Sequence, residues 1–209
     1  MALVRKTPQD EPATEPPPAR DFGSLAERLH DRDPETRRLA AIDLREYPRA
    51  GLTLVEAVAA EQDRTVRDAL LTTLAGFDSV EVAQALAQFL RSDDASLRTA
   101  VTDSLIAMAD CAPDVLPGLL ADPDPDVRIR AVTVVKELAT SEHLCRLLEE
   151  LVAFDEVENV VAASVEALYD LDAPVLLATA ELAVRRFPGN PYLQHLESMV
   201  RAQHVGAQS

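Results

Sequence analysis

The sequence predicts an all-α solenoid, a right-handed superhelix of about five helical hairpins followed by a C-terminal helical cap. Three observations favour this fold class: a short motif recurs about every 30 residues, the segment after each copy has helical periodicity, and aromatic residues make up only 4% of the chain, with no Trp. A period of this length is typical of stacked repeats, in which each unit contacts its neighbours. A core of Leu, Val and Ala suits thin helices that pack closely.

The recurring motif begins with Asp and places Arg four residues later. Its copies are Asp33-Pro34-Glu35-Thr36-Arg37, Asp63-Arg64-Thr65-Val66-Arg67, Asp94-Ala95-Ser96-Leu97-Arg98 and Asp124-Pro125-Asp126-Val127-Arg128. The arginines, at positions 37, 67, 98 and 128, are 30, 31 and 30 residues apart. A fifth, decayed copy spans 156–160 and has Val160 where the arginine would stand.

Each unit is predicted to contain a first helix, a tight turn and a second helix that the motif opens. An Asp before the first turn accepts backbone N–H bonds and lies at the positive end of the helix dipole. In the first and fourth copies a proline follows at the first helical position, where a missing N–H costs nothing. Counted from the arginine, apolar residues at −1, +3 and +7, such as Val66, Leu70 and Leu74, form one stripe. This stripe is the expected core face of the second helix.

The repeat array is predicted to occupy 21–172. Residues 1–20 hold five of the 14 prolines and few apolar residues, so we expect a disordered Pro-rich tail. Residues 173–203 are predicted to be capping helices, separated by the helix-breaking run Pro188-Gly189-Asn190-Pro191. Residues 204–209 are expected to form a frayed tail.

The net charge and the composition limit the classes of partner that the protein is expected to bind. The chain has 20 Lys and Arg against 36 Asp and Glu, a net charge of −16. This field disfavours nucleic acid and anionic membranes, and favours a protein or peptide partner, one with a basic surface among the options. The sequence has no apolar run of membrane-spanning length and no N-terminal signal, and Cys111 and Cys145 make no disulfide framework. We therefore expect a cytoplasmic protein, and the Ala- and Arg-rich composition suggests a bacterial one.

The motif also resembles a known family. The segment 124–131, Asp-Pro-Asp-Val-Arg-Ile-Arg-Ala, is similar to HEAT repeats, and most similar to the short bacterial HEAT-like repeats of phycobilisome lyases. The resemblance covers about 22–170 and implies a solenoid whose relatives include scaffolds, adaptors and a few enzymes. It also implies a structural ladder, in which the acidic and basic motif residues pair within or across units. By this resemblance Asp33, Asp63, Asp94 and Asp124 would pair with Arg37, Arg67, Arg98 and Arg128.

No motif for catalysis, cofactor binding or metal binding is found. HEAT-like di-iron hydroxylases use repeated His-Glu pairs, whereas this chain has only the reversed Glu142-His143. There is no Gly-rich phosphate loop and no nucleophile–base signature. HEAT-like DNA glycosylases need a basic groove and aromatic side chains that this sequence does not provide. A subunit of a bilin or cofactor-attachment lyase stays an alternative, because the acceptor cysteine would belong to the client protein.

The remaining candidate is a binding face on the second helices. Positions +1, +5 and +8 after each arginine lie opposite the core stripe and usually line the concave face in such arrays. The candidate residues are Arg38, Ile42, Arg45, Asp68, Thr72, Thr99, Asp103, Ile106, Ile129, Thr133 and Lys136. The three isoleucines would form an apolar groove with charged ends, or helix rotation would bury them against neighbouring units. We therefore predict a non-catalytic protein-binding scaffold, adaptor, or assembly or regulatory factor, whose oligomeric state stays open.

Overall fold

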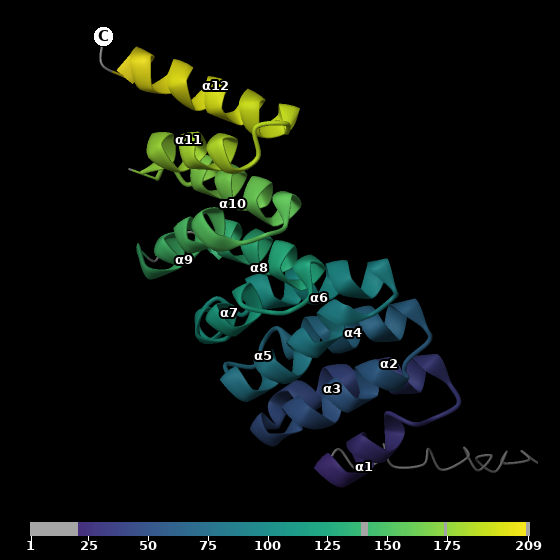
Figure 1. Ribbon diagram of the computed structural model, residues 1–209. Helices are drawn as coiled ribbons and strands as arrows, with labels where there is room; N and C mark the ends of the chain where they lie inside the picture. The colour runs from purple at the N-terminus through teal and green to yellow at the C-terminus, as the bar shows by residue number, and fades with distance from the viewer. Residues whose placement is uncertain (1–20, 139–141, 174, 208–209) are drawn as a thin grey trace, which may run out of the picture.

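The computed structural model describes residues 21–138, 142–173 and 175–207. The tail predicted for 1–20 lies outside these residues, as do 208–209 of the predicted frayed tail. The described part of the chain contains twelve α-helices, three short 3₁₀ helices and no strand. The protein is an all-α solenoid, with its helices stacked along one long axis (Figure 1).

The described helices form six successive hairpins, each with an odd-numbered helix followed by an even-numbered one. The pairs are α1 (Phe22–Arg28) with α2 (Pro34–Asp43), α3 (Gly51–Ala60) with α4 (Arg64–Leu74), α5 (Val80–Ala87) with α6 (Ala95–Ala107), α7 (Ala112–Leu120) with α8 (Pro125–Leu138), α9 (Glu142–Phe154) with α10 (Glu158–Asp170), and α11 (Leu176–Arg186) with α12 (Pro191–Ala207). The 3₁₀ helices η1 (Leu44–Glu46) and η2 (Pro48–Ala50) follow α2, and η3 (Gln88–Arg91) follows α5.

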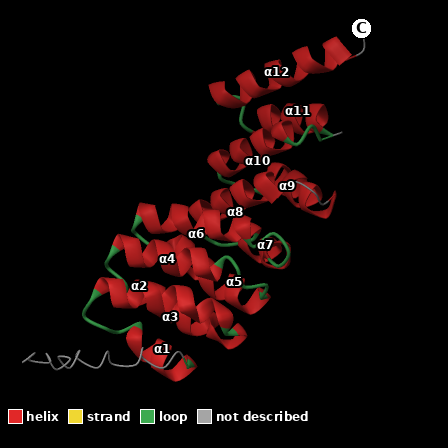
Figure 2. Cartoon of the chain, turned by 180° about the vertical axis from the view of Figure 1, so that it is seen from behind, coloured by secondary structure: helices red, strands yellow, loops and turns green. Residues whose placement is uncertain are grey.

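The hairpins stack in two layers. Helices α2, α4, α6, α8, α10 and α12 pack in order in one layer, and α3, α5, α7, α9 and α11 pack in order in the other (Figure 1). Viewed from behind, short loops join the layers along the edges of the stack (Figure 2). The segment predicted to be a cap continues this alternation as a sixth hairpin, and α12 extends to Ala207, beyond the predicted end at 203.

The aspartates of the motif open the second helices as expected from their chemistry. The carboxylates of Asp33, Asp63 and Asp94 each accept two backbone N–H bonds from the first turn of α2, α4 and α6. Asp124 accepts one from the amide of Asp126, at 2.9 Å. Each bond satisfies a donor that has no partner inside the helix, so the aspartates fix where the helices begin.

The fifth motif copy begins one residue later than the sequence indicates. The N-cap of α10 is Val157, and no side chain caps it. Val160 therefore occupies the core position that Val127 occupies in α8, and both are fully buried. Val161, also buried, stands where the arginine of the other units stands.

One continuous apolar core runs through all six hairpins, from Leu25 to Val200. The stripe predicted for α4 is buried as expected, with Val66, Leu70 and Leu74 all within this core. Between units the helices approach closely: a side chain added at Gly51 on α3 would collide with Val82 on α5.

Candidate functional site

Arg37 ties the first hairpin to the second through a buried carboxylate. Its Nε and Nη2 atoms donate to Glu61 at 2.7 and 3.0 Å, and Nη1 donates to the carbonyl of Asp31 at 2.9 Å. The Glu61 side chain is only 6% exposed. Burial alone would raise the pKa of Glu61, but the bonds from Arg37 and from two backbone amides lower it. The pair therefore stays ionised within the seam between units.

Arg128 forms the same arrangement between the fourth and fifth hairpins. Its Nε and Nη2 atoms donate to Asp155 at 2.7 and 3.1 Å, and Nη1 donates to the carbonyl of Asp122 at 2.7 Å. The side chains of Arg128 and Asp155 are 12% and 5% exposed. A two-point bond of this kind fixes orientation as well as distance, because the guanidinium and the carboxylate are both planar.

The buried acids occupy a second repeated position that the motif does not include. It lies two residues before the N-cap of each second helix, where the side chain accepts the amide of the N-cap residue. These bonds run from Asp33 N to Asp31 at 2.8 Å, Asp63 N to Glu61 at 2.7 Å, Asp94 N to Ser92 at 3.1 Å, Asp124 N to Asp122 at 2.9 Å and Val157 N to Asp155 at 2.8 Å. The predicted site residues do not include this position, although its constant offset from the motif is a signal that the sequence carries.

The ladder pairs inferred from the resemblance therefore need correction. Within the described residues, Asp33, Asp63 and Asp124 form no ion pair with Arg37, Arg67 or Arg128, because their carboxylates face the amides of their own helices.

Among the motif arginines in the described part of the chain, only Arg67 pairs with a motif aspartate, Asp94 of the next unit, at 2.8 Å. Two residues before the N-cap of α6 the chain has Ser92, where the other units have an acid. Arg67 therefore finds no carboxylate at this position and pairs with the N-cap residue Asp94 instead. The hydroxyl of Ser96 and backbone amides, together with Arg67, lower the pKa of Asp94 to about 2.

Arg98 is the exception among the repeated arginines. Among the described residues it forms no ion pair, and it donates only to the carbonyl of Ser92, at 2.6 Å. By position its partner would be Asp122, but Asp122 pairs with Arg91. The buried Nε atoms of Arg98 and Arg130 both lack a partner in the described part of the chain. Burial and the nearby Arg98 lower the pKa of Arg130, and the charge of Asp126 opposes this effect. The seam between units three and four therefore brings two arginines close together, each with a buried Nε that has no hydrogen-bond partner among the described residues.

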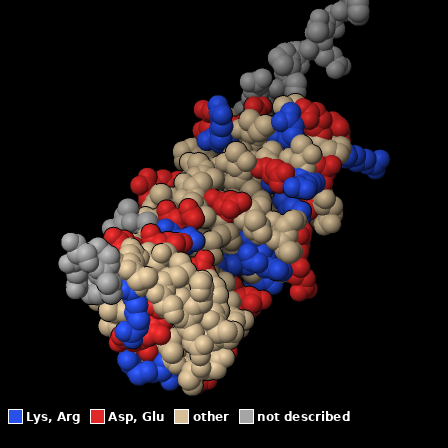
Figure 3. Space-filling view, turned by 90° about the horizontal axis from the view of Figure 1, so that it is seen from above, with Lys and Arg blue, Asp and Glu red and all other residues tan. Residues whose placement is uncertain are grey.

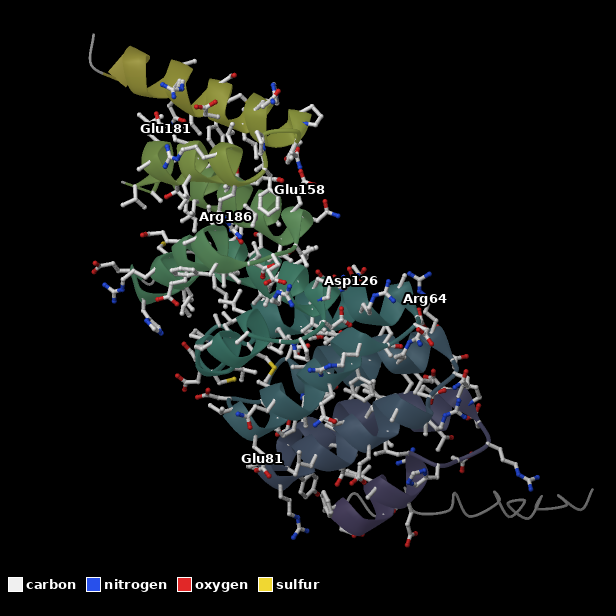
Figure 4. All side chains as sticks on the ribbon, in the orientation of Figure 1. Arg64, Glu81, Asp126, Glu158, Glu181 and Arg186 are labelled. Atoms are coloured by element: carbon white, nitrogen blue, oxygen red, sulfur yellow. The ribbon has the colours of Figure 1, made fainter. Side chains whose placement is uncertain are left out.

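An arginine of the last hairpin replaces the one that unit five lacks. Arg186 on α11 reaches the end of α9, where it donates to the carbonyls of Val152 and Asp155, both at 2.6 Å (Figure 4). The carbonyl of Asp155 is the counterpart of the carbonyl of Asp122 that Arg128 binds. The sixth hairpin therefore provides, through Arg186, the hydrogen bond to the carbonyl of Asp155 that Val161 of unit five cannot donate.

The charged residues of the repeated motif thus make contacts within the fold. The predicted binding residues lie on the exposed side of the second helices. We call the exposed side of α2, α4, α6 and α8 the B face. In its N-terminal half, Arg38, Ile42, Arg45, Asp68 and Thr72 line one hollow of about 640 Å³, together with buried Phe77. The structure thus brings five of the predicted residues, from two successive units, around a single concavity.

A smaller hollow of about 310 Å³ adjoins it between α4 and α6. Asp68 and Thr72 line both hollows, and Asp103 lines the smaller one with several alanines. Arg38 is bonded to Glu35 at 2.7 and 2.8 Å, whereas Arg45 lies in an exposed pair with Glu46. Arginines therefore line the α2 end of the hollows, each beside a glutamate, and aspartates line them towards α6, while Ile42 and Phe77 add apolar surface.

The other predicted residues line neither hollow. Thr99 and Thr133 are exposed, and their hydroxyls donate to carbonyls four residues earlier, at 3.1 and 3.2 Å. Ile106 and Ile129 are half-buried, as is Ile42, so helix rotation covers these isoleucines only in part.

Lys136, which the sequence predicts at a charged end of the groove, is instead held within the fold. Its ammonium pairs with Asp170 of α10, and the bond to Asp170 raises the pKa of Lys136. The two hollows that predicted residues line therefore lie within the first three units.

Among the described residues, no three His, Cys, Asp or Glu side chains lie close enough together to hold a metal ion. No helix in the same residues combines the length and the apolar character needed to cross a membrane.

Fold and seams define a helical-repeat protein in which arginine–carboxylate contacts join successive hairpins. Residues 24–106 match the family model of HEAT repeats, so the segment from α1 to α6 consists of HEAT repeats. The hairpins after it continue the same two-layer stack, and Arg128 repeats the seam of Arg37 there.

Comparison with solved structures gives two similar chains. One belongs to the complex of CpcE and CpcF of phycocyanin lyase from Nostoc sp. PCC7120, with 18% identity, a TM-score of 0.38, and coverage of 93% of this chain and 99% of that one. The other is an engineered protein, with 16% identity, a TM-score of 0.35, and coverage of 83% and 92%. A search of curated proteins found no match. At these identities and TM-scores neither structure indicates a function for this chain.

Proposed function

We propose that the protein is a non-catalytic binding module, a scaffold, adaptor, or assembly or regulatory factor, that holds a protein or peptide segment on its B face. The observation that carries this proposal is the hollow of about 640 Å³ lined by Arg38, Ile42, Arg45, Asp68 and Thr72. Because α2, α4 and α6 present successive turns on one face, a bound segment contacts more than one unit at once.

The lining residues favour a segment of mixed character. An apolar side chain fits against Ile42 and Phe77 on the floor of the larger hollow. An acidic group of the partner would lie near exposed Arg45, and a basic group near Asp68 and Asp103. The net charge of −16 would speed the encounter with a basic partner. Acidic and basic side chains are interspersed on the face seen in Figure 3, beside a broad area without charged side chains, a pattern less suited to nucleic acid than a broad basic surface.

Paired variants on α2 test the proposal. Ile42→Asp places a charge in the larger hollow, whereas Leu39→Asp places the same charge on an exposed position of the same helix that does not line it. After crosslinking in the native cell and affinity purification, mass spectrometry should find a partner that Leu39→Asp retains and Ile42→Asp loses. If both variants capture the same proteins as the parent chain, the B face does not bind the partner.

A lyase-subunit role would give a different result. Mixing the purified protein with a tetrapyrrole and a client protein would then change the tetrapyrrole absorbance spectrum. Such a change, or turnover of a small molecule without any specific partner, would replace the proposal of a non-catalytic binding module.

The two cysteines support the proposal of a reducing, cytoplasmic location. Cys111 is buried and Cys145 is half-buried, and both are free. Disulfides form and persist mainly in oxidising compartments, so two unpaired thiols fit the cytoplasm better.

A further inference from the structure

The opposite side of the solenoid carries a second candidate surface, centred on Phe154. Phe154 is the last residue of α9 and is 79% exposed, the most exposed large apolar side chain in the described residues. With Leu147 and Leu151 it forms a stripe on α9, since residues at i, i+4 and i+7 share one helix face. The fold does not need an aromatic ring at a position so open to water.

Two hollows flank this stripe. One, of about 380 Å³, lies between α7 and α9 beside Leu120 and Leu151. The other, of about 430 Å³, lies between α9 and α11 beside Val175 and Leu182. Phe154 lines both hollows, so its ring stands between two apolar concavities. Helices α7, α9 and α11, which flank the hollows, are neighbours in one layer (Figure 1). This layer is separate from the B face, which α2, α4, α6 and α8 form.

In the described part of the chain, the basic side chains around the two hollows are paired with acids, whereas two acidic ones are not. Arg128 forms an ion pair with Asp155, and Arg146 forms one with Glu142 at 3.1 Å. Glu150 lines both hollows and Glu149 lines the second, and neither has a hydrogen-bond or ion-pair partner among the described residues. The free charges at the rim are therefore negative, and they complement a cationic partner.

Helix spacing sets the size of that partner. Neighbouring packed helices lie about 8–10 Å apart, so the two hollows are separated by about one such spacing. A partner helix that crosses α9 advances about 10 Å in seven residues, at 1.5 Å per residue. Apolar side chains at i and i+7 would then enter the two hollows, and the side chain at i+3 or i+4 would meet Phe154. Two spacings, from α7 to α11, correspond to about 11–13 residues.

We propose that this surface binds a basic amphipathic helix of about 12–14 residues, whose apolar side chains at i and i+7 enter the hollows on either side of Phe154 and whose Lys or Arg side chains meet Glu149 and Glu150. The mode is that of a helix in a groove, with an aromatic anchor at the centre. This site is independent of the proposed site on the B face.

A fluorescein-labelled 14-residue peptide provides the probe. It carries Leu at i, i+3, i+7 and i+10 and Lys elsewhere, with blocked ends, and its binding to the full chain is followed by fluorescence anisotropy at 150 mM NaCl. Phe154→Ala should weaken binding at least tenfold, whereas Phe154→Trp should preserve it. The double variant Glu149→Gln, Glu150→Gln should weaken binding several-fold. Leu39→Ala, which truncates an exposed apolar side chain on α2, is the matched control and should have no effect.

Further peptides and variants distinguish a helix groove from non-specific charge attraction and from self-association. A peptide with the same composition but scattered leucines, and one with Glu in place of Lys, should both bind at least tenfold more weakly. Equal binding of the scattered peptide would mean attraction to the overall negative charge and would overturn the proposal, as would an unchanged affinity of Phe154→Ala. Sedimentation of the chain alone decides between occupants: a dimer that Phe154→Ala dissociates would identify a second copy instead. Ile42→Asp, which alters the B face, should leave peptide binding unchanged. A negative result at the Phe154 surface is therefore distinguishable from a negative result at the B face.

Discussion

Replacing Arg128 with Ala should destabilise the solenoid strongly. The substitution removes two bonds to Asp155 and one to the carbonyl of Asp122, and leaves the carboxylate of Asp155, 5% exposed, with only the amide of Val157 as a partner. Removing one member of a buried ion pair costs about 3–5 kcal/mol, because the remaining charge is left uncompensated. For a chain of this size each kcal/mol lowers the melting temperature by about 2–4 °C, so the expected fall is roughly 10 °C.

Urea unfolding followed by circular dichroism gives the free energy, and thermal melts give the temperature. Arg98→Ala is the internal control, because Arg98 loses only its bond to the carbonyl of Ser92 and its removal relieves Arg130 of a like charge. Its cost should stay within about 1 kcal/mol, the value of one hydrogen bond. Adding Asp155→Asn to Arg128→Ala should recover part of the loss, since the neutral amide still accepts from Val157. Equal destabilisation by the two alanine variants would refute a stabilising role for the buried ion pair at this seam.

Three further outcomes follow from single groups. Because bonds from Ser96 and from backbone amides hold the pKa of Asp94 at about 2, below its ordinary 3.8, its charged form stabilises the fold above pH 4. This stabilisation is lost as the pH falls through 2, so the melting-temperature difference between the parent and Asp94→Asn should shrink from pH 5 to pH 2; a constant difference would contradict it. Arg186→Gln should speed amide exchange in α11 and α12 and leave α1–α6 unchanged; uniform acceleration would argue against a local tie. Burial raises the pKa of the Cys111 thiol, so Cys145 should react first with a disulfide reagent at pH 8, and equal rates would disprove the difference.

Much of the fold follows from the sequence because its signals are local. An aspartate that caps a helix acts within its own first turn, and a stripe such as Val66, Leu70 and Leu74 depends only on helical periodicity. A 30-residue period then specifies stacking, because identical units present identical faces. The sixth hairpin is harder to predict, since its sequence lacks the motif and its role depends on Arg186 reaching back to α9.

The partners of the arginines could not be predicted in the same way. Several oxygen atoms lie within reach of each arginine at the contact between units. The arginine binds those whose hydrogen bonds are not already taken up by backbone amides. Asp33 and Asp63 are satisfied by amides, so Arg37 binds Glu61 instead. The candidate binding residues come together only in part for the same reason: Ile42 and Thr72 line one hollow, but Lys136 is paired with Asp170, a residue on the next hairpin.

Site-specific photocrosslinking on the B face tests the proposed function most directly. A photoreactive amino acid at Thr72, an exposed residue that lines both hollows, is compared with one at Glu56, an exposed residue on α3 in the opposite layer. In the native cell the probe at Thr72 should crosslink to a discrete protein, and Ile42→Asp should abolish the adduct, while the probe at Glu56 should give none. The same adduct from both positions, or no adduct from Thr72 while the protein is bound to a partner, would contradict binding on the B face.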